Sequence, residues 1–258
     1  MITIFTPAYN RKHTLTRLYE SLKNQTDRDF EWLIVDDGST DKTEELIKDF
    51  QKENIINIRY IYQENGGKQR AVNHGVREAL GEYFFIVDSD DYLSENAVEM
   101  IKKYSFSLPK DFGGMVFRKI NISDENYRNI HFTEKYIDSN PIDIVYKHHL
   151  YGDKGEIFKT EILKKFPFPE FQGEKFVPEG YIWNRIGKKY NLRYIDYGIY
   201  YFEYLEDGYT KNFKRDLQRN PQGFGVYYKD MLTYDIPLSA KIKFFLRYLQ
   251  TKFYKVIK

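Results

Sequence analysis

Short apolar runs alternate with amphipathic stretches over the first part of the chain. The runs are rich in β-branched and aromatic residues, as buried strands are, and they cover residues 2–5, 32–35, 57–62 and 83–87. In the stretches between them apolar residues recur at helical spacing, which predicts helices over residues 15–22, 43–50 and 71–79. This alternation of strands and helices predicts a parallel sheet joined by right-handed crossovers.

The second part of the chain follows a less regular pattern. We predict strands at residues 113–120, 155–159 and 194–205, a short helix up to residue 166, a loop over 166–178 and a helix over 181–190. We assign residues 1–220 to a single α/β domain, whose two halves are residues 1–105 and 106–220. Residues 221–258 are assigned to a helical tail.

The end of this tail is basic and amphipathic. Between residues 238 and 258 there are six Lys or Arg and no acidic residue. The apolar residues that fall at helical spacing are Ile242, Phe245, Leu246, Leu249, Phe253 and Val256. Such a helix suits the surface of an anionic membrane, packing on the rest of the chain, or pairing with a second copy. The sequence leaves these three open, although packing on protein is the commoner fate of an amphipathic helix.

Polar clusters follow the first four predicted strands at the point where each strand ends. In an open parallel sheet ligands bind beyond the carboxyl ends of the strands, so we expect the four clusters to meet at one edge. They read Pro7-Ala8-Tyr9-Asn10-Arg11, Asp36-Asp37-Gly38-Ser39, Asn65-Gly66-Gly67-Lys68 and Asp88-Ser89-Asp90-Asp91.

The fourth cluster is strongly acidic. Neighbouring aspartates repel one another at neutral pH unless a cation compensates them, and Mg²⁺ and Mn²⁺ take carboxylate oxygens together with substrate phosphates and water. In an extended chain Asp88 and Asp90 point the same way, about 6–7 Å apart. One of them is then able to bind a metal while the other binds a ribose hydroxyl. The alternative is a solvated turn in which Ser94 caps a helix, but the companion clusters favour the metal site.

Two other clusters suit a nucleotide. The Asp37 carboxylate is able to accept hydrogen bonds from a base or a ribose, and Gly38 allows close approach of the backbone. The glycine turn before Lys68 opens a helix, whose N-terminus favours an anion such as a diphosphate, with Lys68 or Arg70 facing it. The alternative for the Asp37 cluster is a turn with a helix cap formed by Ser39, Thr40 and Asp41, and the alternative for the glycine turn is a turn with solvated charges. The spacing fits neither a P-loop nor a dinucleotide-binding motif.

Composition excludes several classes of protein. The chain has no cysteine, so disulfides and thiolate metal sites are excluded, and a net charge of +2 gives no support to a nucleic-acid partner. The N-terminus is too short and not basic enough for a signal peptide, and no later stretch has the length of an uncharged spanning helix. We therefore expect a cytoplasmic protein, with the tail at the inner face of the membrane as an option.

The combination of motifs resembles the family 2 glycosyltransferases of the GT-A fold, most specifically over residues 1 to about 105. The matching elements are Thr6-Pro7-Ala8-Tyr9-Asn10, Asp36-Asp37-Gly38-Ser39-Thr40-Asp41, Asn65-Gly66-Gly67 and Asp88-Ser89-Asp90-Asp91. The resemblance implies a GT-A-type (Rossmann-like) domain with a mostly parallel sheet. It also implies inverting transfer from a nucleotide sugar, often UDP-linked, with Mn²⁺ or Mg²⁺. Residues 1–105 would bind the donor and 106–220 the acceptor, which would be a glycan, lipid-linked glycan or glycoprotein hydroxyl in surface polysaccharide or glycoconjugate synthesis.

The resemblance also implies roles for individual residues. Tyr9 would lie near the base and Asp37 would bind the uridine. Asp88 would lie near the ribose, and Asp90, with Asp88 beside it, would be the metal ligand. The remaining residues of the expected nucleotide-sugar site are Pro7, Ala8, Arg11, Asp36, Asn65, Gly67, Lys68 and Ser89.

The expected general base departs from the family pattern. Family members usually carry a Glu-Asp pair before a helix, with the Asp as base, whereas here Gly180 follows Glu179. Glu179 is our leading candidate base and Glu174 the second, and the alternative is that Glu179 only caps the helix. The segment Asp207-Gly208-Tyr209-Thr210 is a candidate mobile loop that closes over the donor.

Two other functions stay open at this point. A nucleotidyltransferase shares the α/β sheet and an acidic metal site, but it usually needs a glycine-rich first loop with a cation, and Pro7-Ala8-Tyr9-Asn10 is not one. A non-catalytic nucleotide-sugar binding module would account for the absence of the family's Asp at Gly180.

Overall fold

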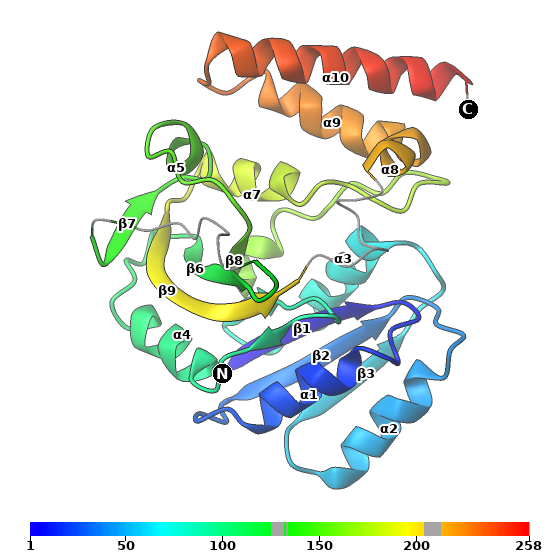
Figure 1. Ribbon diagram of the computed structural model, residues 1–258, viewed down its shortest axis with the longest axis vertical. Helices are drawn as coiled ribbons and strands as arrows, with labels where there is room; N and C mark the ends of the chain where they lie inside the picture. The colour runs from blue at the N-terminus through cyan, green and yellow to red at the C-terminus, as the bar shows by residue number, and fades with distance from the viewer. Residues whose placement is uncertain (125–131, 133, 204–212, 258) are drawn as a thin grey trace.

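The computed structural model describes residues 1–124, 132, 134–203 and 213–257. Within these residues one nine-stranded sheet runs through the molecule, and helices cover both of its faces (Figure 1). The strands lie in the order β3-β2-β1-β4-β8-β6-β9-β5, and β7 is also paired to β9. The predicted α/β architecture with a mostly parallel sheet is confirmed.

The first half of the sheet is parallel throughout. Its strands are β1 (Ile2–Ala8), β2 (Phe30–Asp36), β3 (Ile58–Tyr62) and β4 (Tyr83–Ile86). Its helices are α1 (Leu15–Lys23), α2 (Thr43–Glu53) and α3 (Lys68–Glu78). Helices α1 and α2 pack on one face of the sheet and α3 on the other, so β1 and β2 are buried on both sides. Burial on both faces is the reason that these strands read as continuous apolar runs in the sequence.

The register brings the carboxyl ends of these strands to one edge. Ala8 pairs with Asp36, and Asp36 pairs with Tyr62, so β1, β2 and β3 end level with one another. On the other side of β1, Ile86 at the end of β4 pairs with Phe5. The loops that carry the four polar clusters therefore leave the sheet at the same edge, as the alternation of strands and helices predicts.

The second half extends the same sheet. It contains β5 (Tyr92–Leu93), α4 (Ala97–Ser105), β6 (Gly114–Asn121), β7 (Tyr136–Ser139), α5 (Asp143–Tyr146), β8 (Lys154–Lys159), α6 (Thr160–Leu163), α7 (Gly180–Gly187) and β9 (Leu192–Phe202). Strand β8 runs antiparallel between β4 and β6, so its beginning lies beside the end of β4. The predicted strands at 113–120 and 155–159 correspond to β6 and β8. The predicted strand at 194–205 corresponds to β9, and residues 204–205 lie outside the described part of the chain.

Three helices end the described chain. They are α8 (Phe213–Arg219), α9 (Pro221–Met231) and α10 (Leu238–Ile257). Figure 1 shows α10 as the outermost element, with α9 between it and the rest of the molecule. The helical tail is confirmed, and it consists of the two packed helices α9 and α10. None of the helices in the described residues has the length and apolar character needed to cross a membrane.

Candidate active site

The loops that follow β1 and β2 are joined by side-chain hydrogen bonds. Asn10 has a left-handed backbone (φ +54°), its N–H donates to Ser39 Oγ at 2.8 Å, and its Oδ1 accepts from the Thr40 N–H at 2.8 Å. These contacts fix the course of the first loop and leave the ring of Tyr9 51% exposed at the edge of the sheet. A held, exposed ring at this edge suits stacking against a nucleotide base.

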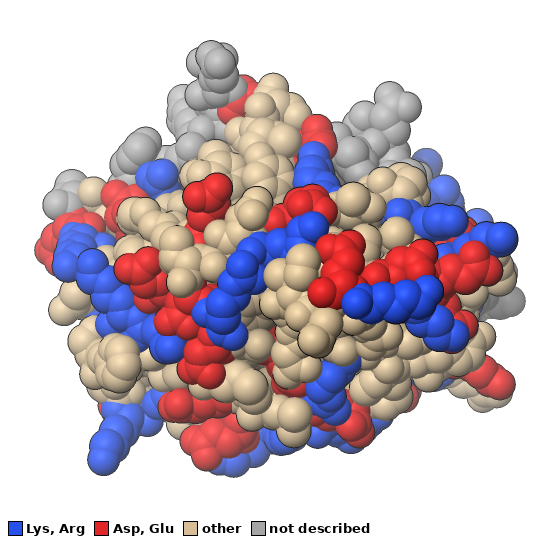
Figure 2. Space-filling view, turned by 90° about the horizontal axis from the view of Figure 1, so that it is seen from below, with Lys and Arg blue, Asp and Glu red and all other residues tan. Residues whose placement is uncertain are grey.

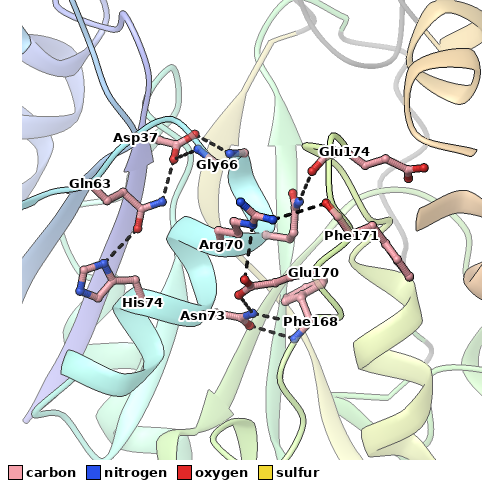
Figure 3. A network of polar contacts seen from close by, with 12 residues as sticks. Asp37, Gln63, Gly66, Arg70, Asn73, His74, Phe168, Glu170, Phe171 and Glu174 are labelled. Atoms are coloured by element: carbon pink, nitrogen blue, oxygen red, sulfur yellow. Dashed lines mark hydrogen bonds and ion pairs between the residues drawn. The ribbon is translucent and has the colours of Figure 1, made fainter. Parts of the chain in front are cut away.

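Asp37 holds the glycine turn that opens α3. Its buried carboxylate accepts hydrogen bonds from the N–H groups of Gly66 at 2.8 Å and Gly67 at 2.7 Å, and from Gln63 Nε2 at 2.7 Å (Figure 3). Gly67 has φ +95°, and a Cβ there would lie 2.2 Å from the backbone oxygen of Lys175, so only glycine fits. In this structure the predicted uridine-binding carboxylate therefore serves first to shape the turn.

Helix α3 ties this turn to the loop of residues 166–178. Gln69 Nε2 donates to the backbone oxygen of Glu174 at 3.3 Å, and Asn73 Nδ2 donates to that of Phe168 at 2.9 Å (Figure 3). The Phe168 N–H donates back to Asn73 Oδ1 at 2.8 Å. This part of the chain has no regular secondary structure, yet α3 holds it in place, and it leads directly to Glu179.

The second candidate base, Glu174, has its carboxylate engaged elsewhere. The side chain is buried and points away from Asp37 in Figure 3. Its oxygens accept hydrogen bonds from the N–H of Gln222 at 2.9 and 3.0 Å and from the N–H of Gly223 at 2.9 Å, in the first turn of α9. A carboxylate at a helix N-terminus satisfies backbone donors that have no partner within the helix. Glu174 thus anchors α9, and this geometry favours Glu179 as the base.

Lys68 joins the acidic cluster to the leading candidate base. Its Nζ lies 2.7 Å from Asp88 Oδ1 and 3.0 Å from Glu179 Oε1. Burial acts to lower the pKa of Lys68, but the two carboxylates outweigh it and raise the pKa well above the ordinary value. Burial acts to raise the pKa of Asp88, and the charges of Lys68 and Lys119 outweigh it and lower the pKa. Lys68 and Asp88 are therefore both charged at neutral pH.

The two aspartates that follow lie in different surroundings. Asp91 is buried and accepts a hydrogen bond from the Tyr200 hydroxyl at 2.6 Å; burial and the charge of Asp88 raise its pKa to about 7. Asp90 is half-buried, and burial and then the charge of Asp88 raise its pKa, while the charge of Arg11 lowers it. The acidic cluster thus carries negative charge that the protein compensates at Asp88 but not fully at Asp90.

This donor set fits a hard divalent cation. Carboxylate oxygens are the ligands that Mg²⁺ and Mn²⁺ prefer, and a cation would relieve the charge whose burial raises the pKa of Asp90. Among the described residues no group of three or more His, Asp or Glu forms a ready metal cage. Substrate phosphates and water would therefore complete the coordination. That Asp90, with Asp88 beside it, would hold the ion stays a prediction, and Asp88 is already paired with Lys68.

Two side chains at this edge carry no local sequence signal. Tyr200 on β9 donates to Asp91 and accepts a hydrogen bond from the Asp88 N–H at 2.9 Å, so it holds both ends of the acidic turn. Lys119 on β6 places its Nζ 3.8 Å from the centroid of the Tyr200 ring and 3.9 Å from Asp91 Oδ2. Both residues lie in strands far along the chain, and only the sheet topology brings them to the cluster.

Glu156 is a third residue of this kind. It lies on β8, where the antiparallel pair Phe85 and Ile157 places it beside the end of β4. Burial raises the pKa of Glu156 to about 7; the charge of Lys154 opposes this, and the charge of Glu179 adds to it. This edge of the sheet therefore holds a further carboxylate whose pKa is about 7 and on which the charge of the candidate base acts.

We expect Glu156→Gln to stabilise the protein above neutral pH. Below about pH 4.5 the glutamate is protonated in both the folded and the unfolded chain, so it adds no pH dependence. As the pH rises to about 7, the unfolded chain ionises first, and the wild type loses free energy of unfolding. In chemical denaturation the free energy of unfolding of the variant should exceed that of the wild type by a margin that grows between about pH 5 and 8, by on the order of 1–3 kcal/mol. A pH-independent difference would contradict this assignment.

A cavity of about 440 Å³ lies beside Glu179. Its walls are mainly aromatic side chains of α8 and α9. Phe176, Asp216 and the two chain neighbours of Glu179, Pro178 and Gly180, form the rest of the lining. A Cβ at Gly180 would lie 3.4 Å from the ring of Tyr227. An aspartate at this position would therefore project towards the aromatic wall, and glycine leaves that space open.

The remaining predicted residues lie in or beside the same loops. The Asp36 carboxylate accepts from the Tyr60 hydroxyl and from the Ser39 N–H, both at 2.8 Å, and Asn65 Nδ2 donates to the backbone oxygen of Asp37 at 2.6 Å. The other members at this edge are Pro7, Ala8, Arg11 and Ser89, of which Ala8 and Ser89 are buried. The candidate loop at residues 207–210 lies outside the described residues.

Comparison with known proteins identifies the family of this chain. The profile of Glycosyl transferase family 2 matches residues 3–166, so the chain belongs to that family. GlyG of Streptococcus pneumoniae serotype 4 is 36% identical over 133 residues, which is 51% of this chain and 43% of that protein. A chondroitin synthase of Escherichia coli is 41% identical over 100 residues, or 39% of this chain and 14% of that protein. The chain spans less than half the length of each of these relatives.

Two solved structures share the fold over nearly the whole chain. Residues 1–349 of S. aureus TarS in complex with UDP-GlcNAc superpose with a TM-score of 0.71 at 21% identity, covering 98% of this chain and 72% of that one. The mannosyltransferase PcManGT of Pyrobaculum calidifontis in complex with GDP-Man and Mn²⁺ gives a TM-score of 0.66 at 21% identity, covering 97% and 68%. The expected GT-A fold is therefore confirmed.

Proposed function

We propose that this glycosyltransferase transfers a sugar with inversion from a UDP-linked donor to an acceptor hydroxyl. The observation that supports the proposal most strongly is the double ion pair of Lys68. Its ammonium group contacts both the carboxylate of Asp88, on the proposed donor side, and that of the candidate base Glu179. An inverting transfer needs these two sides within reach of one anomeric carbon. The similar fold of TarS, solved with UDP-GlcNAc, supports the choice of a uridine donor.

The donor side consists of the loops after β1 to β4. Tyr9 offers an exposed ring for the base, and the turn held by Asp37 places Lys68 at the start of α3, where it suits a diphosphate. Asp88 suits the ribose, and Asp90 would hold Mn²⁺ or Mg²⁺. When bound, the ion neutralises negative charge on the diphosphate leaving group. The mannosyltransferase PcManGT, solved with Mn²⁺, supports this part of the proposal.

On the acceptor side Glu179 takes the proton. The acceptor oxygen attacks the anomeric carbon and forms the new glycosidic bond as the bond to the diphosphate breaks, and the hydroxyl proton passes to the Glu179 carboxylate. The nucleoside diphosphate leaves with the bonding electrons. The cavity lined by Pro178 and Gly180, the chain neighbours of Glu179, offers a place for the acceptor, because aromatic walls suit the apolar face of a sugar ring.

The acceptor class that we propose is a glycan, a lipid-linked glycan or a glycoprotein, in the synthesis of a surface polysaccharide or glycoconjugate. The match to a chondroitin synthase supports a saccharide acceptor. A nucleotidyltransferase is disfavoured because Pro7-Ala8-Tyr9 forms no glycine-rich phosphate loop. A binding module without catalysis is disfavoured because Glu179 stays at the edge of the site although Gly180 follows it.

The donor is tested by thermal unfolding with a panel of nucleotide sugars. UDP-sugars with Mn²⁺ should raise the melting temperature, since a ligand at 100 times its Kd stabilises by about 2.7 kcal/mol, and the same mixtures should slowly release UDP. The matched controls are the UDP-sugar without Mn²⁺ and a nucleoside triphosphate with a sugar phosphate. Pyrophosphate release from the second mixture would establish a nucleotidyltransferase instead, and stabilisation without any UDP release would establish a binding module.

A further inference from the structure

Helix α10 presents an apolar stripe to solvent. The apolar side chains that the sequence places at helical spacing range in exposure from 47% for Leu249 to 85% for Val256. The others in the stripe are Ile242, Phe245, Leu246 and Phe253. Side chains at this spacing share one face of a helix, so they form a continuous surface along α10. In the part of the chain that the structure describes, this face has no protein covering it.

The opposite face of α10 is docked. Phe244 packs against the rings of Tyr227 and Tyr228 on α9, with centroids 6.2 and 6.1 Å apart, and Thr251 is buried against Gly225. The helix is therefore held in place by a different set of residues from those in the stripe. The sequence indicates one apolar face, whereas the structure has two, and only the aromatic one serves packing.

The charge on α10 is of one sign. The helix carries five Lys or Arg and no Asp or Glu over its 20 residues. At 100° per residue, Lys241 and Lys252 fall along one flank of the stripe and Lys243 along the other. Figure 2 shows the end of the molecule away from α10, where acidic and basic side chains are interspersed. The one-sign charge is thus a property of this helix and not of the surface in general.

We propose that α10 docks the enzyme on an anionic lipid bilayer, with the stripe inserted among the lipids and its flanking lysines at the headgroups. Apolar side chains between flanking cations are the arrangement by which amphipathic helices lie in the interface of an anionic membrane. A second copy fits less well, because pairing two such faces would bring together the cations of both helices without any acid to balance them. The surface would then hold the enzyme where a lipid-linked acceptor is found.

Sedimentation of the full chain with vesicles tests the proposal. Wild type should bind vesicles of phosphatidylcholine with phosphatidylglycerol and bind pure phosphatidylcholine much more weakly. The triple variant Phe245→Ser, Leu249→Ser, Phe253→Ser should partition at least tenfold less. Its matched control replaces exposed apolar residues elsewhere, Ile55→Ser, Leu80→Ser and Phe106→Ser, and should bind as wild type does. Equal binding of the triple variant and wild type, or no binding by either, would overturn the proposal.

Two further measurements separate the alternatives. Analytical ultracentrifugation without lipid should give the same size for wild type and the triple variant. If wild type is a dimer and the triple variant a monomer, the stripe is instead the interface with a second copy. Stabilisation by UDP-sugar and Mn²⁺ in solution should be equal in both proteins, because the stripe lies on the exposed face of α10, opposite to the face that packs on α9. Vesicle binding and stabilisation by UDP-sugar thus test membrane docking and the proposed transferase function separately, and either proposal can be contradicted while the other stands.

Discussion

Asp90→Asn should slow UDP release from a UDP-sugar by on the order of 100-fold or more, because the substitution removes the carboxylate that we propose as the metal ligand. It should not destabilise the protein when no metal is present. Burial and the charge of Asp88 raise the pKa of Asp90, so the ionised carboxylate is unfavourable in the folded state and a neutral amide is not. Loss of activity with an unchanged or higher melting temperature is the result that separates a metal ligand from a structural residue.

The matched control for this prediction is Asp49→Asn on α2, whose exposed carboxylate pairs with Lys52 on the same helix. That variant should keep both its activity and its response to Mn²⁺. Titration of Mn²⁺ into Asp90→Asn should require a much higher concentration for half-maximal rate, or give no rate. Full Mn²⁺-dependent activity in Asp90→Asn would remove Asp90 from the metal site.

The edge of the sheet that holds the site follows directly from the sequence. Continuous apolar runs identify β1 and β2 because only strands buried on both faces lack alternation, and parallel order then forces their carboxyl ends together. That step requires no knowledge of side-chain geometry. It explains why Tyr9, Asp37, Lys68 and Asp88 are all found at one edge.

The partners of these residues do not follow from the sequence. Three donors saturate the Asp37 carboxylate, and two of them are backbone N–H groups of the turn after β3. Tyr200 and Lys119 reach the acidic cluster through the pairing of β9 and β6, and no local pattern distinguishes them from other residues of those strands. Such contacts depend on strand order in the second half of the sheet, where the pattern of the sequence is irregular.

The same limit applies to the two candidate bases. Glu174 and Glu179 are close in sequence, and both precede a helix. The carboxylate of Glu174 binds the first turn of α9, an element that the sequence pattern does not resolve within the tail. Glu179 instead faces Lys68 across the edge of the sheet. Their roles diverge because of where α9 packs, which is a tertiary effect.

Glu179→Gln should lower kcat by about 10²- to 10⁴-fold, the range expected for loss of a general base, and leave UDP binding almost unchanged. Glutamine keeps the size of the side chain and places an amide oxygen where the carboxylate now pairs with Lys68, so the site should keep its shape. The rate of sugar transfer measures the first effect, and the thermal shift with UDP and Mn²⁺ measures the second. Glu161→Gln, an exposed glutamate on α6, is the matched control and should behave as wild type.

Two more variants separate proton transfer from its alternatives. Glu174→Gln weakens the anchor of α9, so it should lower the melting temperature and leave the turnover of the folded enzyme intact. Gly180→Leu fills the aromatic cavity, so it should raise KM for the acceptor and spare UDP release to water. If Glu179→Gln keeps the wild-type rate while Glu174→Gln loses it, the base assignment is reversed. The role left to Glu179 is then its ion pair with Lys68. If both keep the rate, Glu156 becomes the carboxylate to replace, because its pKa of about 7 and its place beside β4 suit it to accept the same proton.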